Sequence, residues 1–239
     1  MRHRLLKPRF VLLYPLAVLF ALTAHTTERY FRVGVIFIAL GLALRIWANG
    51  YVGHVKVNRT DKSHGGRKIG RLITGGPYAF VRHPLYLGSF LLGAGFCFIA
   101  GSPWLGLATL GFFLFAYRRK MAQEESLIAE EVGEPYVKYK ASVPQWLPLR
   151  GRYPDRQGTW VWQGFAASRE WKTIVWTIVL VLVFYLREEF FQEHELFTPE
   201  SWPKHAVAIA LIAAAVLFDV ALRLKLFKNS APVVSRAPA

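Results

Sequence analysis

The chain has 239 residues, of which 54% are hydrophobic and only 19% carry a charge. Soluble domains have about 25% charged residues, so this composition favours a membrane protein. The formal net charge of +15 does not indicate a nucleic-acid partner, because the basic residues stand beside apolar runs, as in the cytoplasmic loops of membrane proteins.

The first apolar segment covers residues 10–24 and has no convincing cleavage site after it, so we expect a transmembrane helix rather than a signal peptide. The second, Val33–Ala48, contains one charge, Arg45, which we expect to reach the lipid headgroups. Two further uncharged segments, Thr173–Leu186 and Ala206–Phe218, lie near the C-terminus. Each is expected to cross the membrane, and an interfacial position for one of these short segments remains the alternative.

The longest apolar run, Pro84–Tyr117, has 34 residues without a charge. As one helix it would be about 51 Å long, too long for a hydrocarbon core about 30 Å thick. The stretch AGSPW at 100–104 contains residues that end helices and form turns, so it predicts a hairpin of two helices. Cys97 lies inside this run and is the single cysteine, which excludes disulfides and cysteine-rich metal sites, and we expect no metal.

The charges between the apolar segments predict the topology. Basic residues dominate 49–82, 118–120 and 223–228, whereas 187–204 contains five glutamates. The positive-inside bias then gives about six transmembrane helices with both termini in the cytoplasm and the acidic loop outside. His205, beside that loop, is expected to be solvated. The fold class is therefore all-α, an integral membrane helical bundle that includes a helical hairpin.

The motif GGPYAFVRHPLYLG, residues 75–88, stands at the start of that hairpin. Pro84 fits the first position of a helix and disfavours helix at His83, so we expect the helix to begin at Pro84. An imidazole, the ring of Tyr86 and the N–H groups of the first turn together suit a small zwitterionic ligand. In the alternative interpretation, Arg82 binds a lipid phosphate while His83 and Tyr86 anchor at the membrane interface.

A second motif, KMAQEE at residues 120–125, follows the hairpin. Lys120 and Glu124 are four residues apart, so a surface ion pair is the simplest interpretation. A hairpin also brings its two cytoplasmic ends together. Glu124 and His83 are therefore expected to face one pocket. Gly133 followed by Pro135 predicts the end of this helix.

Three elements in this order, GPYAFVRHPLYLG, the pair EE and GEPYVKYKASVPQWLP, make residues 30–150 similar to the isoprenylcysteine carboxyl methyltransferases. More broadly, they resemble the integral membrane methyltransferases that include phospholipid N-methyltransferases. The resemblance implies a cytoplasmic pocket for S-adenosylmethionine and a lipophilic or prenylated acceptor drawn from among membrane lipids. It assigns cofactor binding to Gly70, Arg71, Leu72, Ile73, Tyr78, His83, Pro84, Leu85, Tyr86 and Glu124. Lys120 stands where the family has a substrate-contacting arginine, so Lys120 and Glu124 are the catalytic candidates.

These observations predict four regions: a membrane methyltransferase core at 1–150, an amphipathic connector at the cytoplasmic surface at 151–170, two additional transmembrane helices at 171–228, and a disordered tail at 229–239. Methyl transfer to a carboxylate needs neither a metal nor a covalent enzyme intermediate, because the nucleophile is already ionised and has only to be positioned. A phospholipid amine remains open as the acceptor. A sterol-type NADPH-dependent membrane reductase, which carries a similar Arg-His-Pro-x-Tyr stretch, and a non-catalytic lipid-binding protein remain as alternatives.

Overall fold

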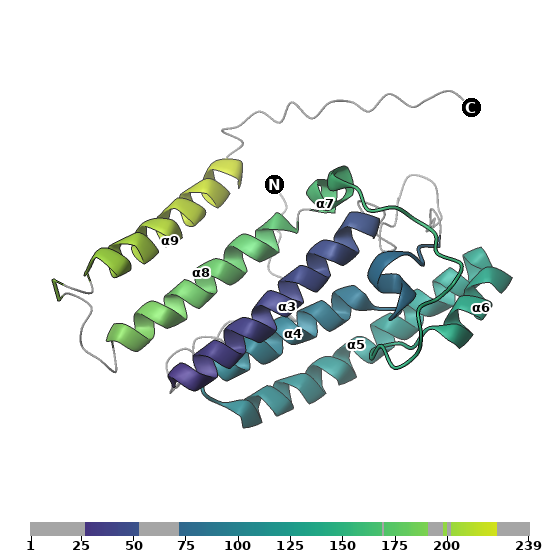
Figure 1. The fold of residues 1–239 in the computed structure, drawn as a ribbon, viewed down its shortest axis with the longest axis horizontal. Helices are drawn as coiled ribbons and strands as arrows, with labels where there is room; N and C mark the ends of the chain where they lie inside the picture. The colour runs from purple at the N-terminus through teal and green to yellow at the C-terminus, as the bar shows by residue number, and fades with distance from the viewer. Residues whose placement is uncertain (1–26, 53–71, 169, 191–197, 200–201, 224–239) are drawn as a thin grey trace, which may run out of the picture. The chain divides into compact units, whose positions relative to one another are not determined.

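The computed structural model describes residues 27–52, 72–168, 170–190, 198–199 and 202–223. Within these ranges the regular structure is entirely helical and contains no strand, so the all-α class is confirmed for this part of the chain. The first expected membrane helix, 10–24, lies outside it. The helices are α3 (Glu28–Val52), the 3-10 helix η1 (Gly76–Ala79), α4 (Pro84–Ile99), α5 (Pro103–Val132), α6 (Glu134–Ser142), α7 (Trp162–Ser168), α8 (Trp171–Glu188) and α9 (Trp202–Arg223) (Figure 1).

The chain divides into two compact units, Met1–Ile174 and Val175–Ala239. The first contains α3 to α7 and every candidate site residue that the structure describes. In the second, His205 is 1% exposed and its Nε2 lies 3.5 Å from Glu189 Oε2. The expectation that His205 is solvated is therefore wrong.

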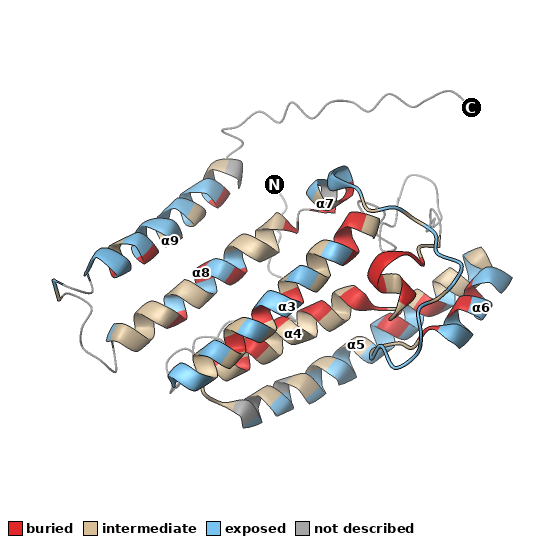
Figure 2. Cartoon of the chain, in the orientation of Figure 1, coloured by how far each residue is buried: buried red, intermediate tan, exposed pale blue. Residues whose placement is uncertain are grey.

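Helices α3 and α4 pack backbone to backbone. A Cβ atom placed on Gly34 would lie 2.5 Å from the carbonyl oxygen of Gly95, and one placed on Gly41 would lie 2.9 Å from that of Gly88. Small residues at this spacing allow membrane helices to approach closely. Figure 2 shows that buried residues gather along this contact and around η1. The contact fixes the start of α4 beside the last turns of α3.

The predicted hairpin is confirmed by α4 and α5. Helix α4 begins at Pro84, with His83 in a non-helical conformation before it, and ends at Ile99. The turn uses Gly101 at φ 68°, a conformation that glycine adopts without a steric penalty. Helix α5 starts at Pro103 and continues to Val132, where Gly133 at φ 69° ends it as predicted.

Two helices of the described part are long and apolar enough to cross a membrane, Glu28–Val52 and Trp202–Ala221. Helix α4 is apolar but shorter. Large exposed apolar side chains on α5 include Leu107, Phe112 and Phe115, and such a surface suits contact with lipid. These features agree with a membrane protein, while the count of about six spans and the orientation of the termini stay predictions.

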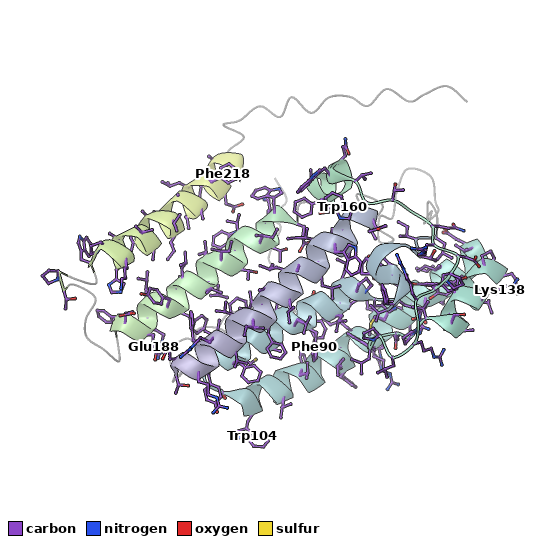
Figure 3. All side chains as sticks on the ribbon, in the orientation of Figure 1. Phe90, Trp104, Lys138, Trp160, Glu188 and Phe218 are labelled. Carbon is purple, nitrogen blue, oxygen red and sulfur yellow. The ribbon has the colours of Figure 1, made fainter. Side chains whose placement is uncertain are left out.

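A polar cap, formed by α6 and residues 143–161, covers η1 and the C-terminal half of α5. Its small core consists of Tyr136, Tyr139 and Val143, with Leu72 and Tyr153 packed against it. Backbone hydrogen bonds join the cap to the motif loop: Arg82 N–H donates to Pro144 O (2.9 Å), Tyr153 N–H to Ala79 O (2.9 Å) and Gly75 N–H to Gln157 O (2.9 Å). Figure 3 shows Lys138 of the cap at one end of this unit and Trp104 of the hairpin turn at the other.

Candidate functional site

The start of α4 meets the two adjacent glutamates of α5. The Tyr86 hydroxyl donates a hydrogen bond of 2.9 Å to Glu124 Oε1. His83 Nε2 lies 3.0 Å from an oxygen of Glu125. Consecutive helical residues point about 100° apart, so the two carboxylates reach different partners. The structure brings His83 and Glu124 to the same end of the hairpin, but the partner of His83 is Glu125.

Glu125 is the centre of a buried ionic network. Its side chain is 7% exposed and contacts Arg82 Nε and Lys140 Nζ, each at 3.0 Å, as well as the imidazole of His83. Gln145 Nε2 donates a further hydrogen bond of 3.3 Å. Burial by itself would raise the pKa of Glu125, but the hydrogen bonds from His83 and Lys140 and the charge of Arg82 outweigh it and lower the pKa to about 2. Glu125 is therefore ionised throughout the physiological range.

Arg82 ties this network to the polar cap. Its Nη1 donates to the carbonyl oxygens of Lys140 (2.8 Å) and Val143 (2.9 Å), and its side chain is 12% exposed. All of these partners are protein groups. The alternative in which Arg82 binds a lipid phosphate is therefore wrong.

Around Glu124 the environment is aromatic and more open. Lys120 Nζ lies 4.0 Å from Glu124 Oε1, which is the expected ion pair, and the Lys120 side chain is 49% exposed. The same ammonium lies 5.5 Å from the ring centroid of Tyr86 and 5.7 Å from that of Tyr117. Distances below about 6 Å allow cation–π attraction. The site thus holds a cation beside two adjacent aromatic rings and a carboxylate.

Three other predicted binding residues, Leu72, Ile73 and Tyr78, precede or lie within η1. Tyr78 in η1 accepts a hydrogen bond of 2.7 Å at its backbone oxygen from the Tyr139 hydroxyl. Desolvation raises the pKa of the Tyr78 hydroxyl well above its usual value, so the phenol stays protonated. Leu72 packs against the core of the cap, and Ile73 is half-buried. Gly70 and Arg71 lie outside the described residues.

Pro84 and Leu85 occupy the first turn of α4. Leu85 contacts Arg45, a residue expected at the lipid headgroups. Arg45 Nη1 donates to the Leu85 carbonyl oxygen at 3.1 Å. The Arg45 side chain is 16% exposed and forms an ion pair with Glu170. The expectation that Arg45 reaches the lipid headgroups is therefore wrong. Residues 45 and 170 are far apart in sequence, and no local pattern links them.

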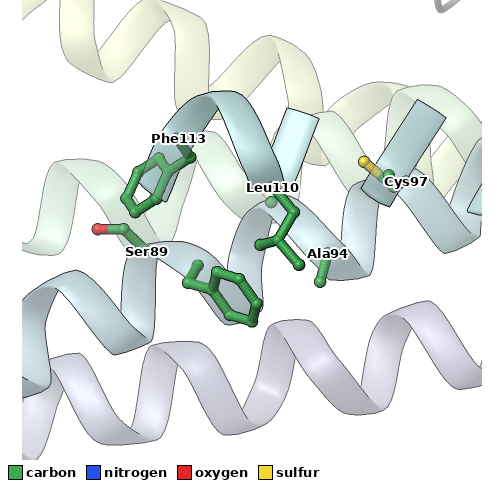
Figure 4. A pocket seen from close by; sticks show the side chains of 8 residues that line it. Ser89, Ala94, Cys97, Leu110 and Phe113 are labelled. Atoms are coloured by element: carbon green, nitrogen blue, oxygen red, sulfur yellow. The ribbon is translucent and has the colours of Figure 1, made fainter. Parts of the chain in front are cut away.

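An apolar hollow lies between α4 and α5, on the side of the ionic site that faces the hairpin turn (Figure 4). It is lined by Ser89, Phe90, Gly93, Ala94, Cys97, Gly106, Leu110 and Phe113. Phe113 stacks on Tyr117 with ring centroids 4.2 Å apart, and Tyr117 meets Tyr86 edge to face at 5.2 Å. Three rings therefore connect the hollow to Glu124 and Lys120.

The segment that carries this geometry is similar to known proteins. Residues 30–134 match the phospholipid methyltransferase family. The match includes almost all of α3 together with η1, α4 and α5, and ends at the beginning of α6. It therefore covers His83, Tyr86 and both glutamates.

The individual relatives are more specific. The chain is 30% identical to the protein-S-isoprenylcysteine O-methyltransferase of Schizosaccharomyces pombe over 120 residues, 47% of each chain. It is 30% identical to the Xenopus laevis protein of the same name over 124 residues, 49% of this chain and 40% of that one. These matches confirm the resemblance found in the sequence. The chain spans about half the length of these relatives or less.

A longer match is to the cobalt-zinc-cadmium resistance protein CzcN of Cupriavidus metallidurans, 28% identical over 155 residues and 63% of each chain. Among the described residues, no group of three or more His, Cys, Asp and Glu side chains is placed to hold a metal ion. No solved structure matches the chain.

Proposed function

We propose that this protein is an integral membrane methyltransferase that moves a methyl group from S-adenosylmethionine to a lipophilic acceptor, the carboxylate of an isoprenylcysteine-like molecule. The observation that carries the proposal is the placement of a cation, the Lys120 ammonium, against the adjacent Tyr86 and Tyr117 rings and beside the Glu124 carboxylate. The similarity of residues 30–134 to phospholipid methyltransferases and the isoprenylcysteine O-methyltransferase relatives support it.

The residues present fit the cofactor. S-adenosylmethionine combines a sulfonium, an amino group, ribose hydroxyls and a carboxylate, and when bound it supplies an electrophilic methyl group. Electron-rich rings attract a sulfonium as they attract the Lys120 ammonium. Glu124 would bind the cofactor's amino group or ribose hydroxyls, and the hydrogen bond from Tyr86 would hold the Glu124 carboxylate in place. The N–H groups in the first turn of α4 would attract the cofactor's carboxylate.

The remaining predicted residues complete this site. Leu72, Ile73 and Tyr78 precede or lie within η1 next to the polar cap, where they would line the cofactor's nucleoside end together with Gly70 and Arg71. The buried network of Glu125 would support the site, because it holds the adjacent residues Arg82 and His83 immediately before α4. Preorganised groups of this kind lower the cost of orienting reactants.

Lys120 and the hollow suit the two ends of the acceptor. An acceptor carboxylate is ionised at neutral pH, and the half-exposed Lys120 ammonium would attract and orient it. Its apolar chain would lie along the apolar faces of α4 and α5, with the small hollow between them as the point of entry. An amine acceptor would first have to lose a proton. The nearest candidate base is His83, whose side chain is 8% exposed and whose Nε2 contacts Glu125. Because His83 is already engaged in this contact, the site favours a carboxylate acceptor over an amine.

The test uses the purified protein in lipid nanodiscs. Isothermal titration with S-adenosylmethionine and, separately, NADPH distinguishes a methyltransferase from a reductase. Incubation with a deuterated methyl donor and either a prenylated cysteine or phosphatidylethanolamine, followed by mass spectrometry, identifies the product. We expect binding of the methyl donor and a base-labile methyl ester on the prenylated cysteine. Binding of NADPH without affinity for the methyl donor, or a methylated amine alone, would overturn the respective part of the proposal.

A further inference from the structure

Arg45 and Glu170 form a bidentate ion pair within the first compact unit. Arg45 Nε lies 2.5 Å from Glu170 Oε1, and Nη2 lies 3.0 Å from Oε2. The side chains are 16% and 7% exposed. Arg45 comes from an apolar part of α3, and Glu170 from the junction between α7 and α8, beyond the segment that matches the methyltransferase family.

The same guanidinium donates hydrogen bonds to the first two turns of α4. Arg45 Nη1 donates to the carbonyl oxygen of Leu85 at 3.1 Å and also to Ser89 Oγ, which in turn donates to the Leu85 carbonyl at 3.0 Å. A Cβ atom on Gly88 would lie 2.5 Å from Arg45 Cγ. The Arg45 side chain therefore lies against α4 at Gly88, where a side chain at position 88 would collide with it.

A charge buried in an apolar helix is costly, and a buried ion pair often adds little net stability even when its geometry is good. Its position suggests another role. Leu85 lies between Pro84 and Tyr86, two residues after His83. A shift of the Leu85 carbonyl would displace its neighbours Tyr86 and His83, whose side chains contact Glu124 and Glu125.

We propose that Arg45 and Glu170 are positioning residues: the pair locks the first turn of α4 so that Tyr86 and His83 reach the two glutamates of α5. The effect on catalysis rests on the proposed function, whereas the effect on α4 does not. The pair also makes the segment after residue 134 part of the site, through a residue that touches neither cofactor nor acceptor.

The first test compares Glu170→Gln with Glu28→Gln, in full-length protein in nanodiscs. Glu28 pairs with Arg32 on the same helix α3 at 2.8 Å, but these side chains are 82% and 69% exposed, so this pair contributes little. Hydrogen–deuterium exchange of residues 84–92 reads the order of α4 directly. We expect faster exchange there and a rise of about tenfold in KM for S-adenosylmethionine in Glu170→Gln, and wild-type values in Glu28→Gln.

The second test separates positioning from simple helix attachment. The exchange of charges in Arg45→Glu/Glu170→Arg restores an ion pair, but a carboxylate at 45 cannot donate to the Leu85 carbonyl. We expect its thermal stability to recover while exchange at 84–92 and KM do not. Recovery of all three would overturn the proposal. If the charge-reversed protein does not fold, Ser89→Ala replaces it, because this substitution leaves the ion pair intact and removes one link to α4. Hydrogen–deuterium exchange at the wild-type rate in Ser89→Ala would count against positioning.

The outcomes distinguish this inference from the proposed function. Faster exchange in Glu170→Gln together with a wild-type protein that transfers no methyl group would uphold the lock and overturn the proposed function. An active wild-type enzyme, together with unchanged hydrogen–deuterium exchange and an unchanged KM in Glu170→Gln, would uphold the proposed function and overturn the lock.

Discussion

The hydroxyl of Tyr86 donates a hydrogen bond to the carboxylate of Glu124, which joins the start of α4 to α5 across 38 positions of sequence. Tyr86 also turns its ring toward the Lys120 ammonium. One side chain thus contributes an aromatic face and a hydrogen-bond donor to the same point. The ring and the hydroxyl can be tested separately.

Removal of the Tyr86 hydroxyl is expected to weaken cofactor binding without unfolding the protein. In Tyr86→Phe the ring remains, while Glu124 loses a donor, and a hydrogen bond to a charged group contributes about 1.5–3 kcal/mol. We expect a rise of about tenfold in the Kd for S-adenosylmethionine, measured by titration, and little change in melting temperature. Tyr30→Phe, near the start of α3 and away from Glu124, is the matched control. Equal effects of the two substitutions would contradict the assignment.

The adjacent glutamates are expected to respond in opposite ways. Glu125→Gln leaves Arg82 and Lys140 without their buried counter-charge, and breaking such a network costs about 3 kcal/mol of unfolding free energy or more. Glu124→Gln affects a more open carboxylate and should raise the Kd for the methyl donor at a nearly unchanged melting temperature. Thermal unfolding and titration of both variants decide the matter. A large loss of stability in Glu124→Gln would argue that its role is structural.

The low pKa of Glu125 predicts an acid limit to stability. Because the pKa is about 2 in the folded protein and 4.5 ordinarily, the ionised network stabilises the fold above about pH 4.5, and this stabilisation is lost as the pH falls from 4.5 toward 2. The contribution is at most about 3 kcal/mol. Melting temperatures between pH 7 and pH 3 should fall less in Glu125→Gln than in the wild type.

Glu124→Gln provides the control for this pH dependence, because it keeps Glu125 and its partners. We expect its melting temperature to follow the wild-type curve. If all three proteins lose stability in parallel, another carboxylate is responsible for the acid limit.

A side chain placed in the apolar hollow is expected to exclude the chain of the acceptor. Gly93 lines the hollow, and a Cβ atom there would meet no atom within 4 Å. Gly93→Leu should therefore fold and raise the KM for a long-chain prenylated acceptor about tenfold, since pocket contacts of this size contribute about 1–3 kcal/mol. The Kd for S-adenosylmethionine should not change.

Gly111 offers a matched position for that experiment. It lies in α5, a Cβ atom there would also meet nothing within 4 Å, and it does not line the hollow. Gly111→Leu should leave the acceptor KM at its wild-type value. Similar increases in both variants would show that the acceptor chain does not occupy the hollow.

Local sequence rules predicted the hairpin well, because its boundaries depend on single residues. Pro84 begins α4, the turn at Gly101 and Pro103 separates the helices, and Gly133 ends α5. The prolines restrict their own backbone and the glycines adopt a left-handed conformation that other residues avoid, so these effects can be inferred without knowledge of the rest of the fold.

Long-range ion pairs were beyond such rules. Arg45 and Glu170 are 125 positions apart, and Glu125 meets Lys140 only because α6 folds back along α5 after Gly133. Adjacent helical residues point about 100° apart, so the two glutamates face different directions. Which of them faces His83 depends on the rotation of α5 against α4, and the sequence contains no local signal for that angle.

The glycine contact between α3 and α4 has a consequence for how a molecule dissolved in the bilayer arrives. At Gly34–Gly95 and Gly41–Gly88 the two main chains touch, so no change of rotamer opens a gap there. The opposite flank of α4, facing α5, is where the side chains leave free volume. If the proposed function is right, a hydrocarbon tail would have one flank of α4 by which to approach, and substrate and product would pass this helix on one side only.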